Sequence, residues 1–336
     1  MFKNKIILIS GGTGSFGKHY LDYLLKLKEK PKKIIIFSRD EFKQSNLELK
    51  YKKFKNILRF FLGDVRDKNR LDQALEDVDF VIHAAALKQV PAAEYNPIEF
   101  IKTNIIGTQN IIEASISNKI SKFILLSTDK ACSPLNLYGA TKLSAEKLCT
   151  SANNIIGNKN IKLSIVRYGN VMGSRGSVLP TFLEQKKTGV LKITHKDMTR
   201  FHITLDDAVR LVNFSFQNML GGEIFIPKLR SFKIIDLAKT IAPKSKIKFI
   251  GLRPGEKIHE EMISLFDSPN TIDCGNFFVI YPSQELKNKE IADPPSVKRA
   301  QSACGRPIPR PPTPPAARVL RALYGGLSAI FSSFLT

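Results

Sequence analysis

The sequence predicts an α/β fold with a doubly wound parallel sheet, and three observations lead to this prediction. Short apolar runs of strand length alternate with longer helix-like stretches through the first half of the chain. A glycine-rich turn follows the first apolar run. Polar clusters follow later runs, at the strand ends where open α/β sheets bind their ligands. We expect a sheet domain over residues 1–170, a smaller C-terminal substrate-binding domain over 171–286, and an atypical tail over 287–336.

The first predicted strand is Lys5–Ile9, and the turn Ser10–Gly17 leads from it into a helix-like stretch. The glycines fit both Gly-x-x-Gly-x-x-Gly and Gly-x-Gly-x-x-Gly. Glycine allows the tight turn, the close approach of a pyrophosphate and the close packing of helix on strand, and phosphates bind at the helix N-terminus. This order of strand, glycines and helix predicts a Rossmann dinucleotide-binding site. Its candidate residues are Gly11, Thr13, Gly14, Ser15, Phe16 and Gly17.

The second predicted strand, Lys33–Phe37, is followed by Ser38, Arg39 and Asp40. An acid at the end of this strand usually binds the ribose 2′-hydroxyl of NAD. In this chain Ser38 and Arg39 come first, and an Arg suits a 2′-phosphate. We therefore expect NADP to be the cofactor. The alternative is that Asp40 binds the ribose of NAD and that Arg39 is a surface residue.

The third and fourth predicted strands, Ile57–Leu62 and Val78–His83, also end in candidate cofactor contacts. An Asp after the third strand can accept a hydrogen bond from an adenine amino group, although a simple turn residue fits equally well. Small residues after the fourth strand let a cofactor lie against the backbone. A helix over about 94–117 carries Asn104 among isoleucines, which predicts an inward hydrogen bond. The cofactor candidates here are Asp64, Val65, Ala84, Ala85, Lys88 and Asn104.

The fifth predicted strand, residues 123–126, leads into the densest polar cluster of the chain. Tyr138 and Lys142 follow it four residues apart on a predicted helix, so they share one face. A Tyr can transfer a hydroxyl proton, and a Lys one turn away favours the ionised Tyr and can bind a ribose. The alternative is an ordinary strand–loop–helix with a surface Tyr–Lys pair. The polar residues at the strand end are Ser127, Thr128, Asp129 and Lys130.

The second half of the chain begins with a sixth predicted strand, Ile161–Val166, and then becomes irregular. We expect a helix over 205–218 to pack back on the first domain. The basic, glycine-containing loops could bind a diphosphate together, although their spacing equally allows independent surface residues. The candidate substrate contacts are Lys88, Asn170, Arg175, Arg200, Arg253 and Glu256.

Composition limits the classes of function further. The 336 residues carry a formal net charge of +22, but the Lys residues are spread along the whole chain, so we expect a solvated surface and no nucleic-acid partner. No apolar run of about 20 residues is present, so we expect a cytoplasmic protein without a membrane span. The scattered Cys and His predict no metal site. Pro and Arg become frequent after about residue 285, which predicts a disordered tail.

Taken together, these motifs match a known family. From about residue 3 to 282 the chain resembles an extended short-chain dehydrogenase/reductase, and more narrowly the inverting UDP-N-acetylglucosamine 4,6-dehydratases of pseudaminic acid biosynthesis. Ordinary hexose dehydratases place Glu at the position of Lys130, so an Asp–Lys pair is typical of this branch. The tail does not resemble the family. The blocks that carry the resemblance are GGTGSFGK (11–18), FSRDEFKQ (37–44), GDVRD (63–67), HAAALKQVPAAEYNP (83–97), STDKA (127–131), NLYGATK (136–142), RYGNVMGSRGSV (167–178) and RPGEKIHE (253–260).

The resemblance implies a mechanism and a set of roles. It implies that NADP⁺ accepts hydride from C4 of UDP-N-acetylglucosamine while Tyr138, assisted by Lys142, removes the hydroxyl proton. Lys130 would remove the C5 proton and Asp129 would protonate the departing C6 hydroxyl, with Thr128 in the same catalytic set. Hydride return to C6 and protonation of C5 from the opposite face would give UDP-2-acetamido-2,6-dideoxy-β-L-arabino-hex-4-ulose. The resemblance also implies a homo-oligomer, either a dimer or a hexamer.

The sequence leaves two rival functions. A retaining dehydratase or a 5-epimerase acting on a UDP-sugar would use the same scaffold, and the configuration of the product at C5 distinguishes it. A basic nucleotide-fold protein without catalytic activity is the second rival. The complete Thr–Asp–Lys–Tyr–Lys set argues against that second function.

Overall fold

The computed structural model describes residues 1–157, 159–173, 177–282 and 298–299. The chain forms two compact units and crosses between them several times, whereas we expected continuous domains over 1–170 and 171–286, with the helix over 205–218 packing back on the first. It returns to the first unit because later strands extend the sheet of that unit. The described residues of the first unit lie within 1–168, 203–228, 261–282 and 298–299, and those of the second lie within 169–202 and 229–260.

One ten-stranded sheet forms the frame of the first unit. Its strand order is β15-β13-β14-β10-β6-β5-β4-β1-β2-β3. The strands from β10 to β3 run parallel, and β14, β13 and β15 continue the sheet antiparallel to their neighbours. The strands are β1 Ile6–Ser10, β2 Lys33–Ser38, β3 Leu58–Leu62, β4 Phe80–His83, β5 Lys122–Thr128, β6 Lys162–Tyr168, β10 Ile224–Pro227, β13 Thr271–Asp273, β14 Phe277–Ile280 and β15 Lys298–Arg299.

The central strands are continuous apolar runs because helices cover both of their faces. Every residue of β1 and β4 is buried. One buried core cluster includes Leu8, Val81, Phe123 and Ile165 from four neighbouring strands. The confirmed fold class is therefore the doubly wound parallel sheet, and the predicted strands agree with the observed ones to within about two residues at most ends.

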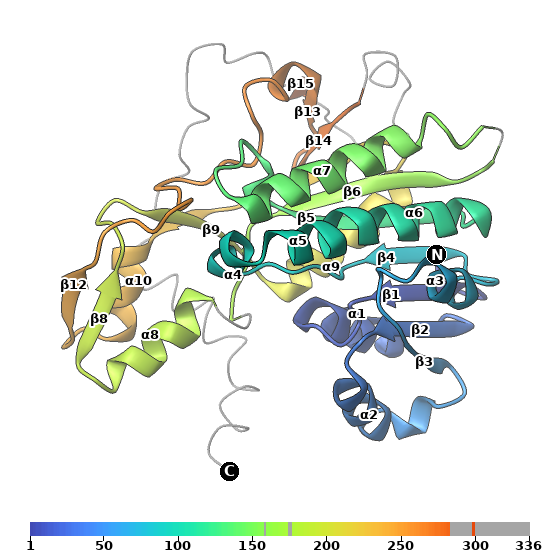
Figure 1. Cartoon of the computed structure of the whole chain (residues 1–336), viewed down its shortest axis with the longest axis horizontal. Helices are drawn as coiled ribbons and strands as arrows, with labels where there is room; N and C mark the ends of the chain where they lie inside the picture. The colour runs from blue at the N-terminus through green and yellow to red at the C-terminus, as the bar shows by residue number, and fades with distance from the viewer. Residues whose placement is uncertain (158, 174–176, 283–297, 300–336) are drawn as a thin grey trace. The chain divides into compact units, whose positions relative to one another are not determined.

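Helices form one layer on each side of the sheet (Figure 1). Helix α6 contacts both α3 and α7 in one layer, while α1 contacts α9 in the other. The α9 helix thus belongs to the first unit and packs against α1, where the Tyr20 hydroxyl donates to Asn213 Oδ1 at 2.7 Å. The helices are α1 Ser15–Lys26, α2 Glu41–Lys50, α3 Lys68–Ala74, α4 Val90–Tyr95, α5 Pro97–Phe100, α6 Gly107–Ser117, α7 Leu137–Ala152 and α9 Leu205–Asn218.

The long helix expected over 94–117 is wrong in detail, because the segment is broken. Helix α4 ends before Pro97, α5 is a single turn, and Ile101–Ile106 form a π-helical turn (η2) before α6 begins. Pro97 cannot donate a backbone hydrogen bond and starts a new helix instead. Asn104 lies inside the π-helical turn, and such turns are frequent at functional sites.

The second unit is smaller and has its own core. A three-stranded sheet has the order β11-β9-β7, and β12 pairs with β8. Helices α8 and α10 contact each other and β8. Their core includes Phe182, Leu191, Met198 and Leu237. The elements are β7 Asn170–Val171, α8 Val178–Lys186, β8 Val190–Ile193, β9 Thr199–Ile203, β11 Ser231–Lys233, α10 Ile234–Ile241 and β12 Lys246–Phe249.

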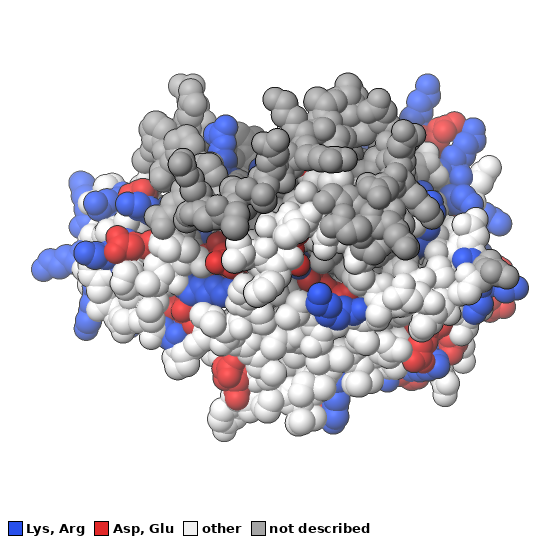
Figure 2. Space-filling model, turned by 90° about the horizontal axis from the view of Figure 1, so that it is seen from above, with Lys and Arg blue, Asp and Glu red and all other residues white. Residues whose placement is uncertain are grey.

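Charged side chains are intermixed on the face shown in Figure 2. Among the described residues of that face, Lys and Arg side chains occur at several separate places, and some of them lie next to Asp or Glu side chains. The expected disordered tail over 287–336 lies outside the described residues, except for Lys298–Arg299, which pair with Asp273 and Ile272 of β13.

Candidate active site

The glycine turn forms a cradle between β1 and α1. Gly11 has φ +64°, and a Cβ there would lie 2.8 Å from the Ala85 amide nitrogen, so glycine is required. A Cβ at Gly17 would lie 2.5 Å from the Cα of Gly12, which shows how closely α1 approaches the turn. Gly14 is the N-cap of α1 and no side chain caps the helix. The first amides of α1 are therefore available to an anion such as a pyrophosphate.

His83 at the end of β4 is hydrogen-bonded to Ser10 at the end of β1, next to this cradle. Ser10 Oγ accepts from the amides of Ala84 and Ala85 at 3.2 and 3.3 Å, so its hydroxyl hydrogen goes to His83 Nδ1 at 2.6 Å. His83 Nε2 then carries the ring proton and donates it to Thr108 Oγ1 at 3.1 Å. Burial lowers the pKa of His83 to about 3. His83 is neutral at physiological pH, so it shapes the cradle without exchanging protons.

The ends of β2 and β3 lie next to the same turn. Thr13 Oγ1 and Ser38 Oγ are 2.9 Å apart, which joins the glycine turn to the second strand. The Arg39 guanidinium is more than half exposed and lies 3.8 Å from the Asp64 carboxylate. Although burial acts to raise it, the hydrogen bonds and charge of Arg66 together with Arg39 lower the pKa of Asp64. An exposed cation and an ionised acid thus lie at the ends of β2 and β3.

Asn104 acts on the loop that carries Lys88. Its Oδ1 accepts from the Leu87 amide at 2.8 Å, and its Nδ2 donates to the Leu87 carbonyl at 2.9 Å and to Thr141 Oγ1 at 3.0 Å. Both amide hydrogens are used within the protein, so Asn104 positions this loop against α7. Its expected contact with the cofactor stays a prediction.

The strand-end acid lies at the centre of the predicted catalytic cluster. Asp129 is fully buried, and its Oδ1 accepts from Thr128 Oγ1 at 2.9 Å and from Lys130 Nζ at 3.1 Å. Its Oδ2 is buried and has no hydrogen-bond partner within the described residues. A buried oxygen without a partner is costly unless a ligand supplies one. Asp129 and Lys130 begin a short 3₁₀ turn, η3 (Asp129–Ala131), directly after β5, and Thr128 is its N-cap.

Helix α7 brings the Tyr–Lys pair to the same place. Asn136 Oδ1 caps the helix by accepting from the Gly139 amide at 2.8 Å. A Cβ at Gly139 would lie 2.2 Å from the Lys130 carbonyl oxygen, so α7 and η3 are in direct contact. Tyr138 is mostly buried, and Lys142 Nζ donates to the Leu126 carbonyl at 2.7 Å. Burial is the main reason why the pKa of Lys142 falls to about 8.

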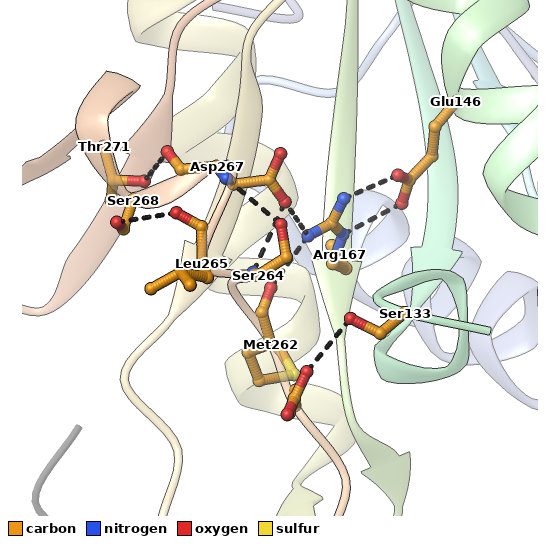
Figure 3. Close-up of polar contacts among 10 residues, drawn as sticks. Ser133, Glu146, Arg167, Met262, Ser264, Leu265, Asp267, Ser268 and Thr271 are labelled. Carbon is orange, nitrogen blue, oxygen red and sulfur yellow. Dashed lines mark hydrogen bonds and ion pairs between the residues drawn. The ribbon is translucent and has the colours of Figure 1, made fainter. Parts of the chain in front are cut away.

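A buried ion-pair network lies one helical turn beyond Lys142 (Figure 3). Arg167 on β6 donates through Nε and Nη2 to the two carboxylate oxygens of Glu146, at 3.0 and 2.7 Å. Its Nη1 donates to the Met262 carbonyl at 2.8 Å and lies 3.4 Å from Asp267 Oδ2. Burial acts to lower the pKa of Arg167, but the paired carboxylate of Glu146 outweighs it and raises that pKa. The network therefore connects α7, β6 and the segment before β13.

The second unit contains the other predicted substrate residues. Arg200 is 9% exposed, donates to the Thr199 and Ile258 carbonyls, and lies 3.8 Å from Glu256 and 3.9 Å from Glu260. Asn170 lies in β7 and Arg253 is exposed, while Arg175 lies outside the described residues. The catalytic candidates and Lys88 belong to the first unit, and these residues belong to the second.

The described residues provide neither a candidate metal site nor a candidate membrane span. No group of three or more His, Cys, Asp or Glu side chains that could bind a metal ion occurs in this part of the chain. None of the helices found there combines the length and apolar character required to cross a bilayer.

The comparisons with known proteins now identify the family. A model of the family described as polysaccharide biosynthesis protein matches residues 7–282. The chain belongs to this polysaccharide biosynthesis family. It is 56% identical over 292 residues to the "UDP-N-acetylglucosamine 4,6-dehydratase (inverting)" of Campylobacter jejuni subsp. jejuni serotype O:23/36 (strain 81-176), a match that covers 86% of each chain. The resemblance inferred from the motifs is thereby confirmed.

The chain is also similar to proteins with other names. The chain is 44% identical over 287 residues to the "UDP-glucose 4-epimerase" of Rickettsia akari, covering 83% of this chain and 84% of that protein. The X-ray structure of Pen from Bacillus thuringiensis has a TM-score of 0.85 and 36% identity, covering 96% of this chain and 99% of that chain. Family membership alone therefore includes relatives named for two different reactions.

The sequence did not single out three buried residues near the candidate site. Glu146 and its bidentate partner Arg167 were not singled out, although Glu146 follows Lys142 at the i,i+4 spacing that places both on one helix face. Tyr168 ends β6 in a buried position, where burial, with the charge of nearby Tyr138, raises its pKa. No pattern in the sequence places Tyr168 near Tyr138, because the pairing of β5 with β6 brings them together.

Proposed function

We propose that this protein is a C5-inverting UDP-N-acetylglucosamine 4,6-dehydratase that uses NADP. The observation that carries the proposal is the contact between η3 and α7, which joins the Asp129–Lys130 pair to the Tyr138–Lys142 pair in one unit. A plain dehydrogenase needs the second pair alone, whereas elimination of water needs a further acid and a further base. The relative from Campylobacter jejuni, which is named for this reaction, supports the same conclusion.

The cradle fits a dinucleotide. The close approach of Gly11 to Ala85, the uncapped N-terminus of α1 and the exposed Arg39 together suit a pyrophosphate and a 2′-phosphate. When bound, NADP supplies a site that accepts a hydride from C4 and returns it to C6. The residues Ser38, Asp64, Val65 and Ala84 line the ends of neighbouring strands and complete the proposed binding set.

The chain's own residues then move the protons. Tyr138 takes the proton from the C4 hydroxyl, and the Lys142 ammonium favours the ionised form of Tyr138 that this requires. Lys130 removes the proton at C5, which the C4 ketone has made acidic. Asp129 gives a proton to the leaving C6 hydroxyl, and Thr128 orients its carboxyl group. Protonation of C5 from the opposite face completes the inversion.

The remaining assignments are also proposals. Lys88, Asn170, Arg175, Arg200, Arg253 and Glu256 bind the UDP-sugar. The protein acts in the cytoplasm as a dimer or hexamer, and its product enters pseudaminic acid biosynthesis. Arg200 already has carboxylates nearby, so a diphosphate would have to compete with Glu256 and Glu260 for its guanidinium.

The first prediction tests the reaction by proton NMR of UDP-N-acetylglucosamine incubated with the protein in D₂O. A C6 methyl signal with deuterium incorporated at C5 and inverted configuration is the expected result. Lys130→Ala should lower the rate of dehydration by a factor of roughly 10²–10⁴, the usual contribution of one general acid–base group. Lys102→Ala, which removes a half-exposed Lys paired with Glu99, is the matched control and should keep full activity.

Three other results would contradict the proposal. Full dehydration by Lys130→Ala would remove the proposed base. Retained configuration at C5 would favour the retaining dehydratase or 5-epimerase. A UDP-hexose epimerised at C4 without any methyl signal would favour the activity named for the Rickettsia relative.

A further inference from the structure

The Glu146 carboxylate, which is paired with Arg167, lies where its negative charge can act on Lys142, a residue of the proposed reaction. Lys142 and Glu146 are four residues apart on α7, so their side chains share one face about 6 Å apart. Lys142 is 4% exposed and Glu146 is 1% exposed. Water screens buried charges poorly, and each of these groups therefore feels the other strongly.

The geometry also keeps Glu146 ionised and in one orientation. Arg167 binds both carboxylate oxygens in a fork, which is the strongest arrangement available to this pair of groups. Without a cation a buried carboxyl would take up a proton. Arg167 in turn is bound by the Met262 carbonyl and by Asp267, so its guanidinium is turned toward the later segment.

A contribution to stability does not by itself explain such a pair. Replacing a buried ion pair by apolar side chains of similar size is often neutral or stabilising, because both charges lose their hydration. The pair adjoins the helix turn that carries the proposed proton-transfer residues. The titratable groups that interact with Lys142 are Glu146 and Cys149 on α7 and His83 on β4. Tyr138 precedes Lys142 by one helical turn, Asp129 and Lys130 lie on η3, which contacts the first turn of α7, and Arg167 on β6 binds Glu146.

We propose that Glu146 is an electrostatic positioning residue, whose charge, fixed by Arg167, keeps the Lys142 ammonium protonated at the pH of turnover. Glu146 touches neither substrate nor cofactor and acts only through Lys142. Burial lowers the pKa of Lys142 to about 8, and the charge of Glu146 works against that fall. Without Glu146 the ammonium would lose its proton near neutral pH, and Tyr138 would lose the cation that favours its ionised form.

The second prediction tests this inference, which rests on the role of Lys142 in the proposed function, by a direct titration of Lys142. The full-length protein is labelled with [ε-¹³C]lysine, and the Lys142 signal is assigned by its absence in Lys142→Arg. Glu146→Gln keeps the shape of the side chain but removes its charge, so the titration midpoint should fall by roughly one to two pH units. Glu113→Gln removes a surface carboxylate paired with Lys68 and should leave the midpoint unchanged.

A second variant keeps the test decisive if the single change unfolds the protein. The double variant Glu146→Gln/Arg167→Met removes both buried charges, and its midpoint should also fall, because the carboxylate that raises the pKa of Lys142 is that of Glu146. A midpoint equal to that of the wild type in whichever variant folds would overturn the inference. A purely structural role for the pair predicts lower thermal stability with that unchanged midpoint.

The pH profile of the hydride step provides the functional readout. The active form needs charged Lys142, so activity should be lost as the pH rises through the pKa of Lys142. In Glu146→Gln this loss of activity at high pH should begin at a lower pH, shifted by the same amount as the NMR midpoint. Failure of the wild type to act on UDP-N-acetylglucosamine would contradict the proposed function, while the NMR titration would still decide the role of Glu146.

Discussion

Asp40 illustrates at the residue scale how one hydrogen bond changes the reading of a motif. The sequence allowed Asp40 to bind a ribose as in NAD enzymes. In the structure its carboxylate caps α2, with Oδ1 accepting from the Lys43 amide at 2.9 Å and Oδ2 paired with the Lys43 ammonium. A carboxylate used in this way is a poor ribose ligand, whereas Arg39 beside it is more than half exposed. This arrangement supports the proposed preference for a 2′-phosphate, and hence for NADP.

The third prediction concerns this cofactor preference. Arg39→Ala should weaken NADP⁺ binding by about tenfold to a hundredfold, the usual value of one or two charge-assisted hydrogen bonds, and leave NAD⁺ binding nearly unchanged. Isothermal titration calorimetry of both cofactors measures the preference. Arg59→Ala removes an exposed Arg of β3 and serves as control. Equal binding of NAD⁺ and NADP⁺ by the wild type would contradict the assignment.

At the scale of elements, the contact between α7 and η3 decides which proton-transfer groups can work together. Gly139 occupies the first turn of α7 and faces the Lys130 carbonyl, where a Cβ would lie only 2.2 Å away. No adjustment of a flexible side chain relieves such a contact, because the neighbour is backbone. The two turns would have to separate, and the Tyr138 and Asp129–Lys130 groups would move apart with them.

The fourth prediction uses that close approach. Gly→Ala normally stabilises a helix by about 0.5–1 kcal/mol. Gly139→Ala should instead destabilise the protein by roughly 1–3 kcal/mol, the usual cost of overpacking, and should also slow dehydration. Urea unfolding and the methyl signal by NMR measure the two effects. Ser144→Ala at a partly buried position of the same helix is the control, and a stabilised, fully active Gly139→Ala would show that the contact is unimportant.

At the scale of the whole molecule, the sheet gathers strands from distant parts of the sequence. The local apolar runs predicted β1 to β6 well, since each buried parallel strand is visible in its own residues. The return of β10, β13 and β14 to the same sheet could not be predicted, because it depends on pairing between segments far apart. The tyrosine and lysine of α7 could likewise be found from their local spacing. Arg167 could not be found as the partner of Glu146, because their contact depends on the pairing of segments that lie apart in the sequence.

The fifth prediction follows from this arrangement. A chain ending at residue 282 keeps β13, β14 and both late partners of Arg167, and it should unfold in one cooperative transition. A chain ending at residue 260 lacks these strands and leaves a buried cation without Met262 and Asp267, so it should lose at least about 3–5 kcal/mol or fail to fold. Thermal unfolding followed by circular dichroism compares the two, and equal transitions would contradict the prediction.

The Arg167 network also has a consequence for how the protein is made. Arg167 meets Glu146 only 21 residues away, but its contacts with Met262 and Asp267 span 95 and 100 residues. Ribosomes add about 5–20 residues per second, so roughly 5–20 seconds separate the synthesis of Arg167 from that of Asp267. During this interval the nascent chain already contains its Tyr–Lys helix but lacks the segment that completes the network. Translation therefore produces the proposed proton-transfer residues first and the segment that completes the Arg167 network last.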